Sequence, residues 1–260
     1  MENLSIEVVT GIVKEAAGLM VTDHFTVIQK GTVENVVTTS DLAVQEFLVE
    51  KLSAALPGCG FLCEEDGVKD TGREYVWVID PIDGTMNYAR GINECSICVG
   101  LMKDGEIVMG VVYSPARGEM YTAEKGHGAF CNGRKLAVSE RPFRDGIICT
   151  AMSTYRKEYA KACNDIIFDI YMRCNDFRRF GAAAIEICML AAGIVDLYFE
   201  MRLQPWDFAA AMLILREAGG CISGYDGKLP PINDPCMVVA ANNQDNLNLI
   251  LETVHKYVVE

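Results

Sequence analysis

The stretch WVIDPIDGTMNY, residues 77–88, contains the residues with the most conspicuous chemistry in this chain. An apolar run ends there in two aspartates, Asp80 and Asp83, which are separated only by a proline and an isoleucine. Two carboxylates held close together repel each other unless a proton or a cation lies between them. The spacing therefore predicts a cation site at the end of a strand.

The residues beside this aspartate pair could bind an anion. Pro81 holds the backbone extended and removes a hydrogen-bond donor, so we expect the strand to stop after Asp80. Gly84 allows a tight turn, after which the amides of Gly84 and Thr85 could open a short helix. Free N–H groups at a helix N-terminus bind anions, so a phosphate ester bridged to divalent metals would use both features.

Three further acidic stretches favour this interpretation over an ordinary acidic loop that caps a helix. FLCEEDG supplies Glu64 and Glu65 after another apolar run, and TTSD has Asp41 beside hydroxyl groups. PWDFAAAMLILREAGG has Asp207 at the start of an apolar helix, where a simple cap is the alternative. Each stretch is weak evidence by itself, but together they indicate a site rich in carboxylates.

The elements that must position these residues follow from the periodicity of the sequence. Helical spacing is present in residues 3–20 and 38–58; in the second, Thr39 or Ser40 is expected as the N-cap, and Pro57-Gly58 ends the helix. Strand and hairpin patterns are predicted at residues 75–80, at 96–115 with a turn at 103–106, and at 128–139 with a turn at 132–133.

The pattern changes after about residue 145. Helices are expected at residues 153–173, 181–193, 205–220 and 242–258, with short strands at 196–201 and 236–242. Hairpins followed by helix–strand alternation suggest two layered halves that share one core, residues 1–145 and 146–260. No linker marks this boundary.

The composition excludes several classes of partner. The chain has 260 residues, half of them hydrophobic, which suits one large or two closely packed domains. Its formal net charge of −13 argues against nucleic acid, which needs clustered Lys and Arg, and against an anionic membrane surface. Because no segment reads as a signal peptide or a membrane span, we expect a cytoplasmic protein.

The eleven cysteines predict reduced thiols rather than disulfides or a zinc site. Cys95 and Cys98 have the spacing of a metal or redox pair, but CSICVGLM reads as a strand, where residues i and i+3 point to opposite faces. No second pair has this spacing, and the three histidines lie far apart in the sequence.

These motifs resemble those of the inositol monophosphatase family, the lithium-sensitive, magnesium-dependent phosphatases of small phosphate esters. The two signatures are WVIDPIDGTMNYARG and WDFAAAMLILREAGG, and EED, RRFGAAAIEICMLAAG and VVAANN occur in the expected order. The resemblance covers nearly the whole chain. It implies an α/β (α+β) sandwich with alternating α-β-α-β-α layers, as in the inositol monophosphatase and fructose-1,6-bisphosphatase fold, and a homodimer.

The resemblance also implies a role for individual residues. Glu64, Asp80 and the carbonyl of Ile82 match the ligands of a first magnesium, and Asp80, Asp83 and Asp207 those of a second. Glu64 resembles the anchor of a third, weaker metal, and Thr85 with Asp41 the pair that orients the attacking water. The expected substrate contacts are Asp83, Gly84, Thr85, Gly181, Ala182, Ala183, Glu200 and Asp207.

The chemistry of magnesium agrees with this assignment. Magnesium prefers hard oxygen ligands and is typically held by carboxylates together with the phosphate of the substrate. A water on the metal would become a usable nucleophile near neutral pH, so no Ser, Cys or His nucleophile is needed. The ester would be cleaved by in-line attack, with the second metal stabilising the leaving alkoxide.

Departures from the family pattern bear on the substrate. Tyr88-Ala89-Arg90 stands where Phe and then Val-His are often found, and Ala182 where Thr or Ser is frequent. Glu200 is kept at the position expected to contact a substrate hydroxyl, but Arg202 is unusual there.

We therefore expect a magnesium-dependent phosphomonoesterase that acts on myo-inositol monophosphate. The alternatives are fructose 1,6-bisphosphate, histidinol phosphate, 3′-phosphoadenosine 5′-phosphate, or another small sugar or alcohol phosphate. A regulatory protein that keeps the fold and acts through a partner is a further alternative, although this chain retains all the expected metal ligands.

Overall fold

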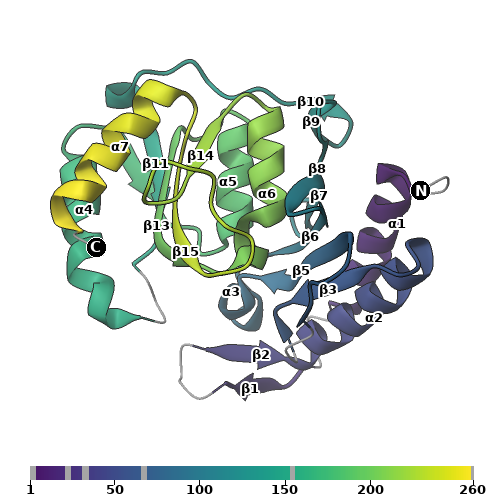
Figure 1. Ribbon diagram of the computed structural model, residues 1–260. Coiled ribbons are helices and arrows are strands. Elements are labelled where there is room, and N and C mark those ends of the chain that lie inside the picture. The colour runs from purple at the N-terminus through teal and green to yellow at the C-terminus, as the bar shows by residue number, and fades with distance from the viewer. Residues whose placement is uncertain (1–3, 21–24, 31–34, 66–68, 153–155, 259–260) are drawn as a thin grey trace.

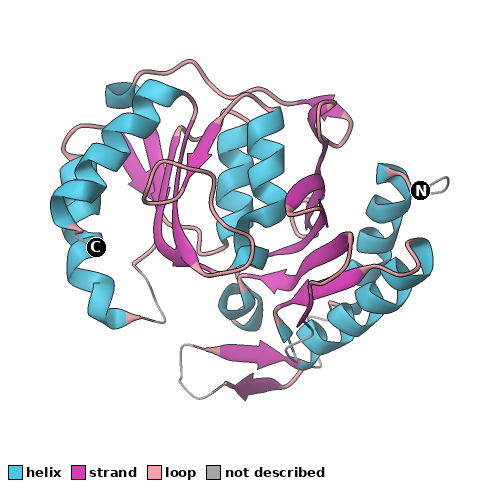
Figure 2. Cartoon of the chain, in the orientation of Figure 1, coloured by secondary structure: helices cyan, strands magenta, loops and turns pink. Residues whose placement is uncertain are grey.

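Two β-sheets separated by a pair of helices organise the chain, and a further pair of helices covers the outer face of each sheet (Figure 1). The computed structural model describes residues 4–20, 25–30, 35–65, 69–152 and 156–258. Figure 2 shows how the helices and strands alternate across the molecule. This α-β-α-β-α arrangement confirms the expected fold class.

The larger sheet has eight strands in the order β10-β9-β8-β7-β6-β5-β3-β4, and only β3 and β5 run parallel. The predicted hairpins at residues 96–115 and 128–139 are both present, and their turn residues Asp104 and Asn132 each adopt a φ of 49°. The strands are β3 (Gly60–Cys63), β4 (Lys69–Asp70), β5 (Tyr75–Asp83), β6 (Ser96–Lys103), β7 (Glu106–Ser114), β8 (Glu119–Glu124), β9 (Gly128–Cys131) and β10 (Arg134–Lys135).

Helices α1 (Ile6–Ala16) and α2 (Thr39–Ala55) cover the outer face of this sheet. The side chains of β5 alternate between the two faces, as a buried strand requires. Trp77 and Ile79 pack into the core that Val13 and Leu48 supply from the outer helices, whereas Val78 packs into the core between the sheets. The sheet is therefore apolar on both faces.

The smaller sheet has five strands in the order β12-β11-β13-β15-β14. Its outer face is covered by α4 and α7, which correspond to two of the four helices predicted for this half, at residues 153–173 and 242–258. The first begins later than predicted, at Ala160, and residues 153–155 lie outside the described part of the chain. The two predicted strands are confirmed as β13 and β15. The elements are β11 (Ile147–Thr150), α4 (Ala160–Tyr171), β12 (Asp176–Arg178), β13 (Leu197–Leu203), β14 (Cys221–Ser223), β15 (Cys236–Ala241) and α7 (Gln244–Tyr257).

The central helices, α5 (Ala183–Ala191) and α6 (Pro205–Glu217), lie between the two sheets (Figure 1). Helix α6 lies so close to β7 that a Cβ atom at Gly110 would come within 2.6 Å of the carbonyl oxygen of Ala210, so only glycine fits at this position. Both helices come from the second half of the sequence but complete the core of the first. The boundary at residues 145 and 146 stays a prediction.

The remaining elements are short. Strands β1 (Val27–Gln29) and β2 (Val36–Thr38) form a separate antiparallel hairpin, and single 3₁₀ turns occupy Ala17–Leu19, Phe143–Asp145 and Lys157–Tyr159. Within the described ranges, the helices are too short or too polar to span a bilayer.

Candidate active site

A β-bulge at the end of β5 brings Asp80 and Asp83 to one pocket. Asp80 is paired with Cys98 of β6 and Asp83 with Ser96, so β5 has one more residue than β6 in this interval. Without the extra residue, positions i and i+3 would point to opposite faces. The strand continues through Pro81, contrary to the expected stop, because Pro81 lies in the bulge beyond the residues that pair with β3.

The turn after β5 requires glycine and begins α3 (Thr85–Ala89), the expected short helix. Gly84 has a φ of 85°, and a Cβ atom there would come within 2.9 Å of the carbonyl oxygen of Glu94. The hydroxyl of Thr85 lies 3.2 Å from a carboxylate oxygen of Asp41 and 3.0 Å from the carbonyl oxygen of Ile82. Since a hydroxyl donates one hydrogen, these two acceptors share it.

Asp41 lies behind Thr85, outside the pocket wall, and is fully buried at the start of α2. Its Oδ2 accepts a hydrogen bond of 2.8 Å from the amide of Thr38, whose side chain in turn caps the helix. The N-cap is therefore Thr38 and not Thr39 or Ser40, because Asp41 at the third helical position completes a capping box with it. Burial raises the pKa of Asp41.

Glu64 and Glu65 follow β3 and share the ammonium group of Lys30. The Nζ atom of Lys30 lies 2.5 Å from a carboxylate oxygen of Glu65 and 3.5 Å from one of Glu64. The backbone of Glu65 is fixed by Gln45, which donates to its carbonyl and accepts from its amide. Burial raises the pKa of Glu65 to about 7 and also raises that of Glu64, which lines the pocket.

The carboxylate of Asp83 binds the N-terminus of α5. The amide of Ala183 donates to one oxygen at 3.2 Å and the amide of Ala184 to the other at 2.8 Å. Unpaired amides at a helix N-terminus favour an anion, which anchors Asp83 between the large sheet and the central helix. Burial nevertheless raises the pKa of Asp83 to about 6. The amide of Ala183 thus donates to Asp83, and Gly181, Ala182 and Ala183, which were expected to contact substrate, all line the pocket.

Asp207 projects from the first turn of α6. Gln204 is the N-cap, and Asp207 at the third helical position accepts a hydrogen bond of 2.8 Å from the Gln204 amide through Oδ2. Only one carboxylate oxygen is used in this contact. Burial raises the pKa of Asp207 well above its usual range, and the nearby carboxylates of Glu64 and Asp83 add to the effect.

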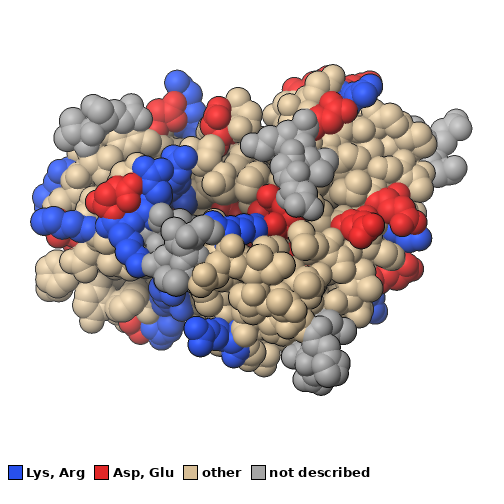
Figure 3. Space-filling view, turned by 90° about the horizontal axis from the view of Figure 1, so that it is seen from below, with Lys and Arg blue, Asp and Glu red and all other residues tan. Residues whose placement is uncertain are grey.

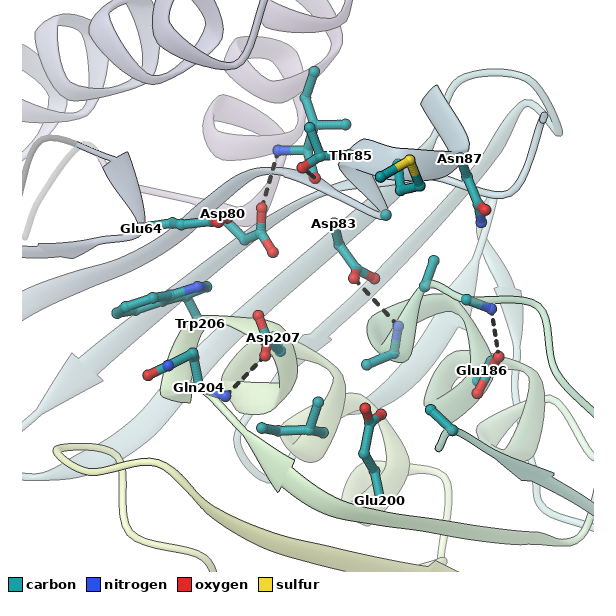
Figure 4. A pocket seen from close by; sticks show the side chains of 18 of the residues that line it. Glu64, Asp80, Asp83, Thr85, Asn87, Glu186, Glu200, Gln204, Trp206 and Asp207 are labelled. Atoms are coloured by element: carbon teal, nitrogen blue, oxygen red, sulfur yellow. Dashed lines mark hydrogen bonds between the residues drawn. The ribbon is translucent and has the colours of Figure 1, made fainter. Parts of the chain in front are cut away.

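Figure 4 shows that the carboxylates of Asp80, Asp83 and Asp207 point into a common space, with Glu64 to one side. Burial, followed by repulsion from Glu64 and Asp83, raises the pKa of Asp80 well above its usual range. Among the residues that the structure describes, no Lys, Arg or His forms an ion pair with any of the three aspartates. Within the described ranges, no positively charged side chain therefore neutralises these three carboxyl groups.

The donor set fits a hard divalent cation such as magnesium, because every candidate ligand is a carboxylate or carbonyl oxygen. The side chains stand apart from one another: within the described ranges, no three acidic, cysteine or histidine side chains are gathered tightly enough to enclose a metal ion. A cation would both supply the missing positive charge and draw these ligands together.

The opposite wall of the pocket carries two more carboxyl groups. Glu200 on β13 accepts a hydrogen bond of 2.7 Å from the hydroxyl of Tyr198, and burial raises its pKa to about 7. Glu186 on α5 accepts two backbone hydrogen bonds with one oxygen, from Phe180 at 2.6 Å and Gly181 at 2.9 Å. The role of Glu186 in this wall was not predicted, because its apolar helix gave no signal of a polar contact.

All the predicted site residues except Asp41 line one pocket of about 620 Å³, within the range of small-molecule sites. Several basic side chains also line it, and of these only Arg202 was noted in the sequence. The others are Lys30, Arg156 and Arg179. Lys and Arg carry no local sequence signal for a pocket, since most occupy solvated surfaces.

The Cys95 and Cys98 pair does not form a metal site. Cys95 packs with Ile82 and Tyr88, whereas Cys98 lies in the core between the sheets. All eleven cysteines are free thiols, in accord with the sequence prediction.

Comparison with known proteins identifies relatives that match most of the chain. Residues 3–258 match the profile of the Inositol monophosphatase family. The chain is 37% identical over 201 residues to the Nus factor SuhB of Escherichia coli K12, covering 76% of this chain and 75% of that protein. It is 35% identical over 222 residues to an inositol-1-monophosphatase of Mesorhizobium japonicum, covering 85% and 83%.

Solved structures agree with the sequence comparison. The extragenic suppressor protein SuhB of Bartonella henselae superposes with a TM-score of 0.88 at 30% identity, covering 97% of this chain and 99% of that one. An IMPase of Thermotoga maritima superposes with a TM-score of 0.86 at 27% identity, covering 99% and 98%. Because both the sequence profile and the structural likeness span almost every residue, the chain belongs to the inositol monophosphatase family and has its phosphatase fold.

Proposed function

We propose that this chain is a magnesium-dependent phosphomonoesterase that hydrolyses myo-inositol monophosphate to inositol and phosphate. One observation carries the proposal: three aspartates from β5 and α6 converge on a single pocket, Asp80 and Asp83 buried and Asp207 half-buried, without a basic partner in the described part of the chain. Such a pocket attracts divalent cations, and through them an anionic ester, to a protein that is itself strongly acidic.

The residues that would hold two or three magnesium ions are Glu64, Asp80, Asp83, Asp207 and the carbonyl of Ile82. Bound magnesium would supply Lewis-acid chemistry, neutralising phosphate oxygens and activating a water. Asp80 interacts with all three of the other carboxylates, because the charges of Glu64, Asp83 and Asp207 each raise its pKa. It is therefore the natural ligand to share between two ions.

The protein's own groups would orient the water and the substrate. Asp41 and the Ile82 carbonyl hold the Thr85 hydroxyl, so its lone pairs face the pocket and can accept a hydrogen bond from the attacking water. The amides of Gly84 and Thr85 at the start of α3 would contact the phosphate. Glu200 would accept a hydrogen bond from a hydroxyl of the leaving alcohol.

A panel of phosphate esters assayed with and without magnesium tests this function. We expect turnover of myo-inositol monophosphate that depends on magnesium and is inhibited by millimolar lithium. No turnover of any ester in the presence of magnesium would refute the proposal, and turnover that is insensitive to lithium would count against a close relation to the inositol phosphatases.

Two other functions are alternatives to this proposal, and the same panel tests the first of them. Other sugar or alcohol phosphates, chiefly fructose 1,6-bisphosphate, are favoured by the arginines in the pocket wall. A role through a protein partner is favoured by the name Nus factor that several relatives carry. Retention of every expected metal ligand supports catalysis over a purely regulatory role. We further propose a cytoplasmic homodimer.

A further inference from the structure

We propose that Asn87 is a positioning residue that fixes the spacing between two walls of the pocket, α3 and the start of α5, and so aligns an ester that touches both. The inference rests on the proposed function, because it concerns how the same site holds its substrate. Asn87 belongs to the same stretch as Asp80, Asp83 and Thr85, but it is neither a candidate metal ligand nor an expected substrate contact.

The side-chain amide of Asn87 joins two loops that lie far apart in the sequence. Its Nδ2 atom donates to the carbonyl oxygen of Glu94, in the loop that leads into β6, and to that of Phe180, in the segment before α5; both distances are 2.7 Å. A primary amide has two N–H donors, so both are used. Because a carbonyl oxygen can only accept a hydrogen bond, these two partners also fix which way the amide points.

The segment that Asn87 binds forms part of the opposite wall. Gly181 lines the pocket, and Glu186 accepts hydrogen bonds from the amides of Phe180 and Gly181 at 2.6 and 2.9 Å. In Figure 4, Asn87 approaches this segment from above and Glu186 from below. The amide of Phe180 is thus bound from within α5, whereas its carbonyl oxygen is bound from α3, by Asn87.

Helix α3 and the start of α5 are closely spaced at this contact. A Cβ atom at Gly181 would come within 3.3 Å of the Nδ2 atom of Asn87. Asp83, four residues before Asn87, also binds the start of α5, through the amides of Ala183 and Ala184. Asp83 is a candidate metal ligand as well, whereas both donors of Asn87 are used within the protein. Asn87 can therefore hold the two walls together whatever the carboxylate of Asp83 binds.

An ester that touches both walls is sensitive to their spacing. The amides of Gly84 and Thr85, at the start of α3, are expected to contact the phosphate, and Gly181 and Ala182 the rest of the substrate. A small displacement of groups that align a substrate costs a large factor in rate. Inorganic phosphate has no alcohol portion and would touch only the α3 wall. The spacing therefore matters more for the ester than for phosphate.

The contact of Asn87 can be removed without changing the charge of the site. Figure 3 shows Lys and Arg side chains meeting acidic ones near the centre of one face of the molecule. A charged substitution near such groups would alter the field that acts on an anionic ester. Alanine in place of Asn87 is neutral, so an effect on the ester reports the lost hydrogen bonds.

The test measures three quantities in wild type and in Asn87→Ala. They are kcat/KM for myo-inositol monophosphate with magnesium, the inhibition constant of inorganic phosphate under the same conditions, and the affinity for magnesium alone. We expect kcat/KM to fall about tenfold and the other two to change by less than about twofold. Asn248→Ala, at an exposed position of α7 outside the pocket, is the matched control and should keep all three values. If Asn87→Ala does not fold, Asn87→Ser takes its place, since its single hydroxyl can donate to only one of the two carbonyls.

Each outcome decides the inference. An unchanged kcat/KM in the folded variant would overturn it, because Asn87 would then only stabilise the fold. A similar change in all three quantities would also overturn it, because Asn87 would then act through the metals or the phosphate. If wild type hydrolyses no ester, the proposed function fails, and calorimetry with myo-inositol monophosphate and inorganic phosphate tests the spacing. Asn87→Ala must then weaken binding of the ester more than of phosphate, and equal effects or no binding of the ester would refute the inference.

Discussion

Glu186 offers a quantitative test of the electrostatics of this site. The residue is only 2% exposed, and burial raises the pKa of its carboxyl group from 4.5 to about 8, with the charges of Glu200 and Asp83 contributing. Because the folded state holds this proton more tightly than the unfolded state, stability must fall as pH rises from about 4.5 to about 8. A tenfold change in proton affinity corresponds to about 1.4 kcal/mol, so the ionised group costs about 5 kcal/mol above pH 8.

Glu186→Gln removes the titration while keeping the contacts. A single oxygen of Glu186 accepts both backbone hydrogen bonds, so the amide oxygen of glutamine can accept the same two. Urea denaturation at pH 5, 7 and 9 in EDTA measures the free energy of unfolding. We expect wild type to lose about 4 kcal/mol more than the variant between pH 5 and pH 9.

Two further variants sharpen this experiment. Glu186→Ala leaves the amides of Phe180 and Gly181 without their acceptor and should be less stable than Glu186→Gln at every pH, by about 1–3 kcal/mol for each amide. Glu252→Gln, at an exposed position on α7, should follow the wild-type profile. Parallel pH profiles for wild type and Glu186→Gln would refute the reasoning, because Glu186 would then titrate at its ordinary pKa.

Three other predictions concern the metals and the substrate. Asp83→Asn should nearly abolish turnover while the protein still folds, because an amide is a poor magnesium ligand but its one oxygen can still accept one of the two hydrogen bonds from α5. Near wild-type turnover would contradict the role of Asp83. Magnesium binding should release more protons at pH 6 than at pH 8, and its affinity should rise with pH, because the pKa of Asp83 is about 6 and those of Asp80 and Asp207 are also raised. Calorimetry in buffers of different ionisation enthalpy measures the number of protons released. Binding that releases no protons would be inconsistent with these ligands. Glu200→Gln should lower kcat/KM for inositol monophosphate about tenfold relative to p-nitrophenyl phosphate, and equal losses on both would assign Glu200 to the metals or the fold.

The local sequence was sufficient to predict elements whose structure depends on neighbouring residues. The hairpins at residues 96–115 and 128–139 form as predicted, because their turn residues select the register of the adjoining strands. The acidic motifs and their order were enough to indicate the family, which the profile match and the superpositions establish. Even so, the end of β5 was misjudged, since a bulge that tolerates Pro81 depends on pairing with β6.

The walls of the pocket were decided by tertiary structure, because they combine residues far apart in the sequence. Asp83 is anchored by amides of α5 a hundred residues later, and Lys30 reaches Glu64 and Glu65 from a separate hairpin. The large pKa shifts of the aspartates come from burial and from one another, which no local pattern reports. The sequence by itself determined which carboxylates are present in this protein. Only packing decided that Arg202 and Glu186 line the same pocket as these carboxylates, because the surroundings of a side chain depend on the elements that pack around it.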